Sequence, residues 1–91
     1  MSTKEKYLEE LDILTQETPS HEIVLYNDDV NTFDHVIDML IDACDHQEEQ
    51  AHQCALLVQY KGKCTVKTGD YEDLKPRCSK LLQGGLSAEI I

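Results

Sequence analysis

Apolar residues recur at spacings of three and four along three stretches of the chain, a pattern that predicts three amphipathic helices. The stretches cover residues 33–44, 47–59 and 71–82. Pro76 lies inside the third stretch and cannot donate to the carbonyl four residues earlier, so this helix should either kink there or begin near Asp73. Two consecutive glycines follow and are expected to end it.

Three shorter segments have the composition of strands. Residues 22–26 include a continuous apolar run, residues 64–67 alternate between apolar and polar side chains, and residues 86–91 follow the last predicted helix. The order is therefore strand, helix, helix, strand, helix, strand. This order predicts an α/β fold of the α+β sandwich type, with the helices on one face of a three-stranded antiparallel sheet.

The first 21 residues differ from the rest of the chain. They carry four apolar side chains at helical spacing, but they are acidic, and Pro19 separates them from the first strand. An isolated helix of about twelve residues is marginal in water. The sequence therefore predicts a flexible N-terminal extension at residues 1–21, able to fold on a partner, and one core domain at residues 22–91.

Charge narrows the range of functions. The 91 residues include 18 acidic and 8 basic side chains, a net charge of −10. Phosphate binding depends on clustered Lys and Arg, which are absent here, so no nucleic-acid partner is expected. No apolar run reaches the roughly 18 residues of a membrane span, and the first residues do not resemble a signal peptide. We expect a cytoplasmic protein with no membrane partner, and the acidic charge favours a monomer with cationic partners.

The cysteines stand at positions 44, 54, 64 and 78, and none forms a Cys-x-x-Cys pair. The spacing typical of structural zinc is therefore absent. Each cysteine falls on an apolar position of a predicted element. This pattern favours buried thiols in a reducing compartment, with a disulfide framework as the alternative.

Three polar residues, Asn27, Asp28 and Asp29, follow the first predicted strand. Their simplest role is a turn that caps the next helix. The alternative is recognition of a cation or of a donor-rich group beside an apolar face. A calcium loop starting at Asp29 is disfavoured, because Asp34 and Leu40 occupy the places of its glycine and bidentate glutamate.

The histidines do not indicate a metal hydrolase. His35 alone is close in sequence to the acidic turn, and a lone histidine on a helix is usually structural or exposed. His46 and His52 are six residues apart, which does not place them on one helical face. No Ser-His-Asp or Cys-His grouping is evident. An enzyme is therefore the least favoured class, and no metal or cofactor is expected.

Three segments together carry a family resemblance: Leu-Tyr-Asn-Asp-Asp at 25–29, Asn-Thr-Phe at 31–33 and Val-Gln-Tyr-Lys-Gly-Lys at 58–63. With the predicted element order, they resemble the ClpS adaptor family over about residues 22–91. The resemblance implies a ClpS-like fold, which is also that of the ribosomal stalk C-terminal domain. It implies a non-enzymatic adaptor that binds N-degrons, protein N-termini that bear a large hydrophobic residue. Such adaptors deliver these proteins to a ClpA-type AAA+ unfoldase for degradation by ClpP.

The resemblance also assigns residues to roles. The expected ligands of the substrate amine and first peptide group are Asn27, Asp28, Asp29 and Gln59. The expected hydrophobic pocket consists of Asn31, Phe33, Val36, Ala55, Val58 and Leu86. The expected unfoldase contact consists of Tyr60, Lys63, Glu72 and Arg77.

Four positions depart from the family pattern. Gln59 replaces the usual histidine, Asn31 a threonine, Phe33 a methionine, and Ala55 a larger residue. These changes predict a reshaped pocket with an altered preference among Leu, Phe, Tyr and Trp. The alternative function is a small structural or assembly domain of the same fold, such as a ribosomal stalk domain, that binds no N-degron.

Overall fold

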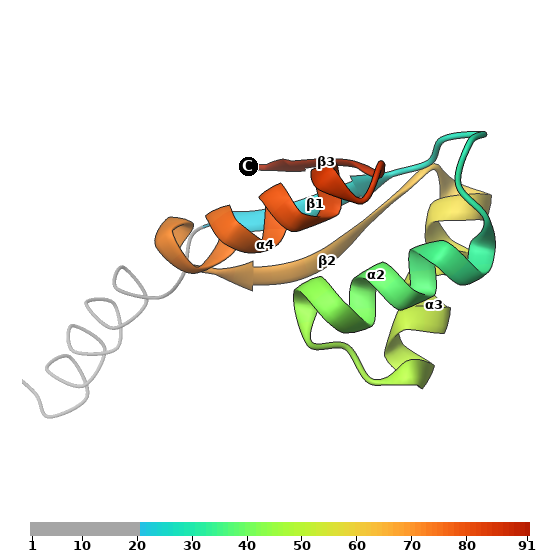
Figure 1. The fold of residues 1–91 in the computed structure, drawn as a ribbon, viewed down its shortest axis with the longest axis horizontal. Helices are drawn as coiled ribbons and strands as arrows, with labels where there is room; N and C mark the ends of the chain where they lie inside the picture. The colour runs from blue at the N-terminus through green and yellow to red at the C-terminus, as the bar shows by residue number, and fades with distance from the viewer. Residues whose placement is uncertain (1–20) are drawn as a thin grey trace, which may run out of the picture.

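A computed structural model describes residues 21–91, and the elements found there follow the predicted order (Figure 1). The proposed flexible extension at residues 1–21 lies outside the described residues, except for His21, which begins the first strand. The elements are β1 (His21–Tyr26), α2 (Phe33–Cys44), α3 (Glu48–Lys61), β2 (Lys63–Gly69), α4 (Tyr71–Gln83) and β3 (Ser87–Ile90).

β1 is the central strand of a three-stranded sheet with the order β2-β1-β3, and both of its neighbours are antiparallel to it. Its position explains its apolar run, because Ile23, Val24 and Leu25 are all buried. Ile23 and Leu25 belong to the core with buried side chains from all three helices. On the opposite face, Tyr26 donates a hydrogen bond to Glu89 of β3.

Capping contacts define the start of α2 and the ends of both α2 and α3. Thr32 caps α2, since its hydroxyl accepts from the backbone N–H of His35 at 3.1 Å. The C-cap of α2 is Asp45, a non-glycine residue in the left-handed conformation with φ 56°. α3 ends at Gly62 with φ 91°, and its N–H donates to the carbonyl of Val58 at 2.9 Å.

α4 begins at Tyr71, so the alternative of a start near Asp73 is wrong. The N–H groups of Asp73 and Leu74 each lie 3.0 Å from the carbonyl of Asp70, and these bonds complete a turn before Pro76. Because Pro76 has no N–H, the helix loses only the hydrogen bond to the carbonyl of Glu72, an exposed residue of the first turn. The helix tolerates this loss because Leu74, Cys78 and Leu81 are buried along its inner face.

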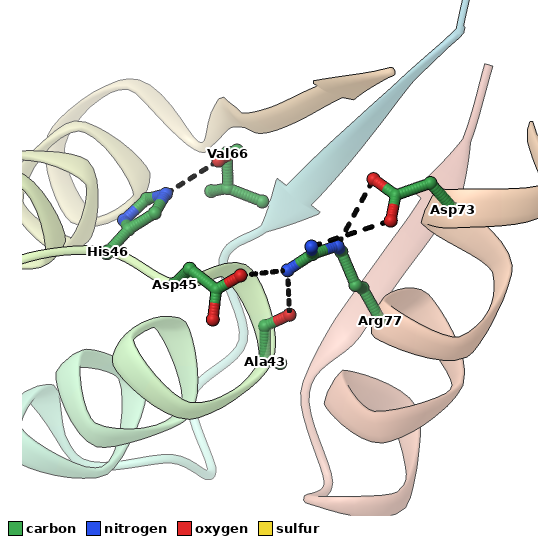
Figure 2. A network of polar contacts seen from close by, with 6 residues as sticks. All are labelled: Ala43, Asp45, His46, Val66, Asp73 and Arg77. Atoms are coloured by element: carbon green, nitrogen blue, oxygen red, sulfur yellow. Dashed lines mark hydrogen bonds and ion pairs between the residues drawn. The ribbon is translucent and has the colours of Figure 1, made fainter. Parts of the chain in front are cut away.

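Polar contacts join α4 and β2 to the end of α2 (Figure 2). Arg77 donates from Nη1 to Asp45 Oδ2 at 2.8 Å and to the carbonyl of Ala43 at 3.2 Å. In the α2–α3 connection, the buried His46 places its Nε2 2.6 Å from the carbonyl of Val66 on β2. Because a carbonyl can only accept, Nε2 carries the proton of this ring.

Candidate functional site

A cavity of about 230 Å³ opens between the end of β1, the start of α2, the last turns of α3 and the residue before β3. All ten residues expected from the sequence to bind the substrate amine or the hydrophobic side chain line this cavity. The lining residues are Leu25, Tyr26, Asn27, Asp28, Asp29, Asn31, Phe33, Val36, Ala55, Val58, Gln59 and Leu86.

The cavity floor is apolar. Leu25, Ala55, Val58 and Leu86 are each no more than 5 % exposed. Ala55 and Val58 are three residues apart on α3 and so share one helical face. Phe33 is half-buried at the start of α2, and its ring packs edge-to-face against His52 of α3 with centroids 5.2 Å apart.

The cavity rim is rich in hydrogen-bond acceptors. Asn27, Asp29 and Gln59 are exposed, and within residues 21–91 no side-chain hydrogen bond engages any of the three. The loop that carries Asn27 is fixed by its backbone, because the N–H of Asn27 donates to the carbonyl of Gly62 at 2.9 Å. Among the described residues, the rim therefore presents unpaired side-chain oxygens from the β1–α2 loop and from α3 around an apolar floor.

Asp28 is the most constrained acceptor on the rim. Its Oδ1 accepts from the backbone N–H groups of Val30 at 3.0 Å and Asn31 at 2.9 Å. The Asn31 amide nitrogen Nδ2 lies 3.0 Å from Oδ1 and 2.9 Å from Oδ2. Oδ2 thus accepts one hydrogen bond and keeps capacity for another donor.

These donors also stabilise the ionised form of the Asp28 carboxyl. They lower the pKa of its carboxyl below the ordinary value of 3.8, the backbone N–H of Asn31 being the largest cause. The carboxylate is consequently ionised at neutral pH. It presents a fixed negative charge beside the apolar floor of the cavity.

Sequence reasoning missed several residues that shape this site. Leu25 and Tyr26 also line the cavity, and the alternation of side chains in β1 could have placed Leu25 on the inner face. His35 is a lone histidine in the sequence, but its Nε2 lies 2.8 Å from the carbonyl of Gly84. No local pattern in the sequence indicates that contact, because the two residues are 49 positions apart.

The four residues expected to contact an unfoldase come from two parts of the described chain, and their role stays a prediction. Tyr60 is 79 % exposed and lies with Lys63 at the α3–β2 turn. Glu72 lies in the first turn of α4, which follows the opposite end of β2 from Lys63, and Arg77 lies further along this helix, which runs back over the sheet (Figure 1). The Arg77 side chain is only 22 % exposed and pairs with Asp45 and Asp73.

The described residues contain no group of three or more His, Cys, Asp or Glu side chains placed to hold a metal ion. The four cysteines are free thiols, and burial raises the pKa of Cys44 to about 11. In the same part of the chain, no helix is both long enough and apolar enough to cross a bilayer.

The fold and the sequence both match known proteins. A protein-family model described as "ATP-dependent Clp protease adaptor protein ClpS" matches residues 16–89. Among solved structures, Agrobacterium tumefaciens ClpS2 bound to L-phenylalaninamide matches with a TM-score of 0.72 and 14 % sequence identity, over 78 % of this chain and 93 % of that chain. At this identity the structural match establishes the fold. Because the family model covers most of the chain, including every residue that lines the cavity, the chain belongs to the ClpS family of Clp protease adaptors, which are not enzymes.

Proposed function

We propose that the cavity binds the free N-terminus of a protein whose first residue has a large hydrophobic side chain. The observation that carries this proposal is the combination, in one cavity, of an apolar floor with a rim of hydrogen-bond acceptors. The related Agrobacterium protein was solved with L-phenylalaninamide, which has a free amine, a benzyl side chain and no carboxylate. A ligand of this kind needs the two surfaces that the cavity supplies.

The amine is the polar half of the ligand. A protonated α-amine is a cation with three donors, and it binds best where ionised and neutral acceptors converge. Asp28 supplies the charge and the remaining capacity of Oδ2, while Asn27 and Gln59 add neutral side-chain oxygens. Gln59 accepts without titrating, so it contributes a hydrogen bond but no pH-dependent charge.

The side chain is the apolar half. Burial of one Leu or Phe side chain is worth roughly 1.5–3 kcal/mol. A cavity of about 230 Å³ is smaller than the roughly 300–1,000 Å³ typical of sites for drug-sized ligands. This size suits one amino-acid side chain, with the rest of the substrate chain leading out past the polar rim.

We further propose that the domain acts as a cytoplasmic monomer and presents its substrate to a ClpA-type AAA+ unfoldase coupled to ClpP. Buried free thiols are typical of a reducing compartment, which supports the location. Tyr60 and Lys63 are the best candidates for the unfoldase contact, because both are exposed at one turn near the cavity. Exchanging them for Ala and Glu should weaken unfoldase binding and leave peptide binding intact.

The test of substrate binding uses fluorescent peptides that begin with Leu, Phe, Tyr, Trp or Ala, each with a free and an acetylated N-terminus. Tight binding of the large hydrophobic residues, lost on acetylation, is the expected result. Asp28→Ala should abolish this binding. Asp38→Ala is the matched control, because Asp38 is an exposed acid on α2 outside the cavity lining.

Two results would count against the proposal. Binding that survives acetylation would show that the amine is not recognised. Failure to bind any of the peptides would favour the alternative of a structural domain with a ClpS-like fold.

A further inference from the structure

The apolar wall formed by Leu86 depends on the turn between α4 and β3. Leu86 follows Gly84 and Gly85, and Gly85 adopts φ 87°, a conformation that favours glycine. The turn is fixed to α4 by backbone bonds from the N–H groups of Gly85 to Leu82 and of Leu86 to Leu81, at 3.0 and 3.1 Å. The carbonyls of the two glycines both accept hydrogen bonds from side chains at the start of α2.

The start of α2 supplies both donors. His35 Nε2 lies 2.8 Å from the carbonyl of Gly84, and Asn31 Nδ2 lies 2.8 Å from the carbonyl of Gly85. Because each carbonyl can only accept, His35 must carry its proton on Nε2. Two side chains of one segment thus bond two consecutive carbonyls of a segment about fifty residues away.

A third residue on the same side of α2 completes the contact. His35 and Met39 are four residues apart on α2 and so share one helical face, while Asn31 lies just before the helix. A Cβ atom placed on Gly84 would lie 2.5 Å from Cε and 2.8 Å from Sδ of Met39. The turn therefore approaches α2 so closely that any side chain at Gly84 would require Met39 to move.

Asn31 connects the two halves of the site. Its amide nitrogen donates to the Asp28 carboxylate at 2.9 and 3.0 Å and to the Gly85 carbonyl at 2.8 Å. These contacts occupy both of its N–H groups. One side chain thus joins the rim carboxylate to the turn that carries the apolar wall.

We propose that Asn31 and His35 are positioning residues that hold Leu86 in the cavity wall and so set which N-terminal side chain the site accepts. This inference rests on the proposed function, since it concerns the selectivity of the same cavity. Leu86 is 4 % exposed, and its apolar side chain has no hydrogen-bonding group that could fix its depth in the wall. Backbone bonds tie Leu86 and Gly85 to α4, and Asn31 and His35 tie the two glycine carbonyls to the start of α2.

The decisive variants alter the donor at residue 35. His35→Phe keeps an aromatic ring and removes the bond to Gly84, whereas His35→Gln keeps an N–H donor on a different side chain. The measurement is the ratio of dissociation constants for peptides that begin with Phe and with Leu. His35→Phe should change this ratio roughly three- to tenfold, within the range that a change of pocket size produces. His35→Gln should restore most of the wild-type ratio, and the loss of affinity on acetylation should persist in both variants.

Amide hydrogen exchange provides a readout that needs no ligand. Exchange of the Gly85 and Leu86 N–H groups should be roughly tenfold faster in His35→Phe than in wild type, and close to wild type in His35→Gln. Asp38→Asn is the control on α2 and should change neither measurement. Circular dichroism of each variant distinguishes a loosened turn from a loss of folding.

Each outcome has one meaning. An unchanged Phe-to-Leu ratio in His35→Phe, with faster exchange, would overturn the role in selectivity. Unchanged exchange would overturn the claim that His35 holds the turn. If the wild-type protein binds none of the peptides, the proposed function fails, and exchange alone then decides whether the two side chains hold Leu86 in place.

Discussion

The hydrogen bonds to the Asp28 carboxylate link the local backbone to the charge of the site. The N–H groups of Val30 and Asn31 stabilise the ionised form, so they lower the pKa of Asp28 below 3.8. A folded-state pKa below the unfolded one adds stability above the unfolded value, and this stability is lost as the pH falls through the folded pKa. The stability that the Asp28 carboxylate contributes should therefore be lost below about pH 4.

We predict that the Asp28 carboxyl, followed by its ¹³C chemical shift, titrates with a midpoint below 3.8. In Asn31→Leu the midpoint should rise toward the ordinary value, because the amide donor is lost. The stability difference between wild type and Asp28→Ala should also shrink below about pH 4. A midpoint above 4 in the wild-type protein would contradict this account.

Ala55 sets the room available to the substrate side chain. It is 3 % exposed on α3 and lines the cavity floor, so a longer side chain there can extend only into the cavity or its walls. We predict that Ala55→Met weakens binding of a Trp peptide by roughly 1–3 kcal/mol, the cost of overpacking, and that of a Leu peptide by less. Equal losses for the two peptides, measured by fluorescence anisotropy, would show that residue 55 does not set the size limit.

The family resemblance indicated which residues line the cavity, whereas no pattern in the sequence indicated contacts between distant segments. The roles of the lining residues in binding stay predictions. The ten expected site residues line one cavity. They could be chosen from the sequence because they stand at fixed positions within the motifs that carry the family resemblance. The bonds of Asn31 and His35 to the glycine carbonyls depend on how α4 returns to the start of α2. No periodicity of one segment contains that information.

At the scale of elements, Arg77 joins the end of α2 to the middle of α4 (Figure 2). Its guanidinium bonds the Ala43 carbonyl, one of the carbonyls that the end of a helix leaves without an internal partner. We predict that Arg77→Met lowers the free energy of unfolding by about 1–3 kcal/mol, since a carbonyl at this junction loses a charged donor. Urea unfolding measures the change.

Lys80→Met is the matched control. Lys80 pairs with Asp42 of α2 at 2.9 Å, but both side chains are at least half exposed. Surface pairs of this kind are worth about 0–1 kcal/mol. If both substitutions lower the free energy of unfolding by the same amount, the hydrogen bond to the Ala43 carbonyl adds no stability beyond that of a surface ion pair.

The elements themselves could be predicted in kind and order, but not at their ends. The apolar periodicity of α2 predicted both of its ends, whereas α3 extends to Lys61 and β2 to Gly69, beyond the expected limits. The start of α4 depended on bonds from Asp73 and Leu74 to Asp70, which the rule about proline does not consider. Local propensity specifies the type of element, while hydrogen bonds at its ends determine its length.

At the scale of the whole molecule, topology decides which predicted residues can act together. The apolar run of β1 is consistent with a central strand, yet the order β2-β1-β3 is a property of the folded chain. That order brings Leu86, next to β3, to the cavity at the end of β1. The chain places Tyr60 and Lys63 where α3 meets β2, and Glu72 and Arg77 on the helix after β2, so a single unfoldase contact would have to include both elements.

The net charge of −10 should affect how fast substrates arrive. A field of one sign around a site raises the association rate of oppositely charged ligands, by about tenfold or more at low ionic strength. The relevant comparison is between two peptides that share an N-terminal Leu and differ only at the third residue, Lys in one and Glu in the other. Their first residues make the same contacts in the cavity, so a difference in association rate reports the long-range field.

We predict that the Lys peptide associates faster by roughly tenfold at about 0.01 M salt, where the Debye length is about 30 Å. The difference should nearly vanish at about 1 M salt, where that length falls to about 3 Å. Dissociation rates should change much less, because the buried side chain and the bonds of the amine are the same in both complexes. Stopped-flow fluorescence separates the two rates. A rate ratio that stays constant with salt would place the effect in a local contact of the third residue and not in the charge of the whole protein.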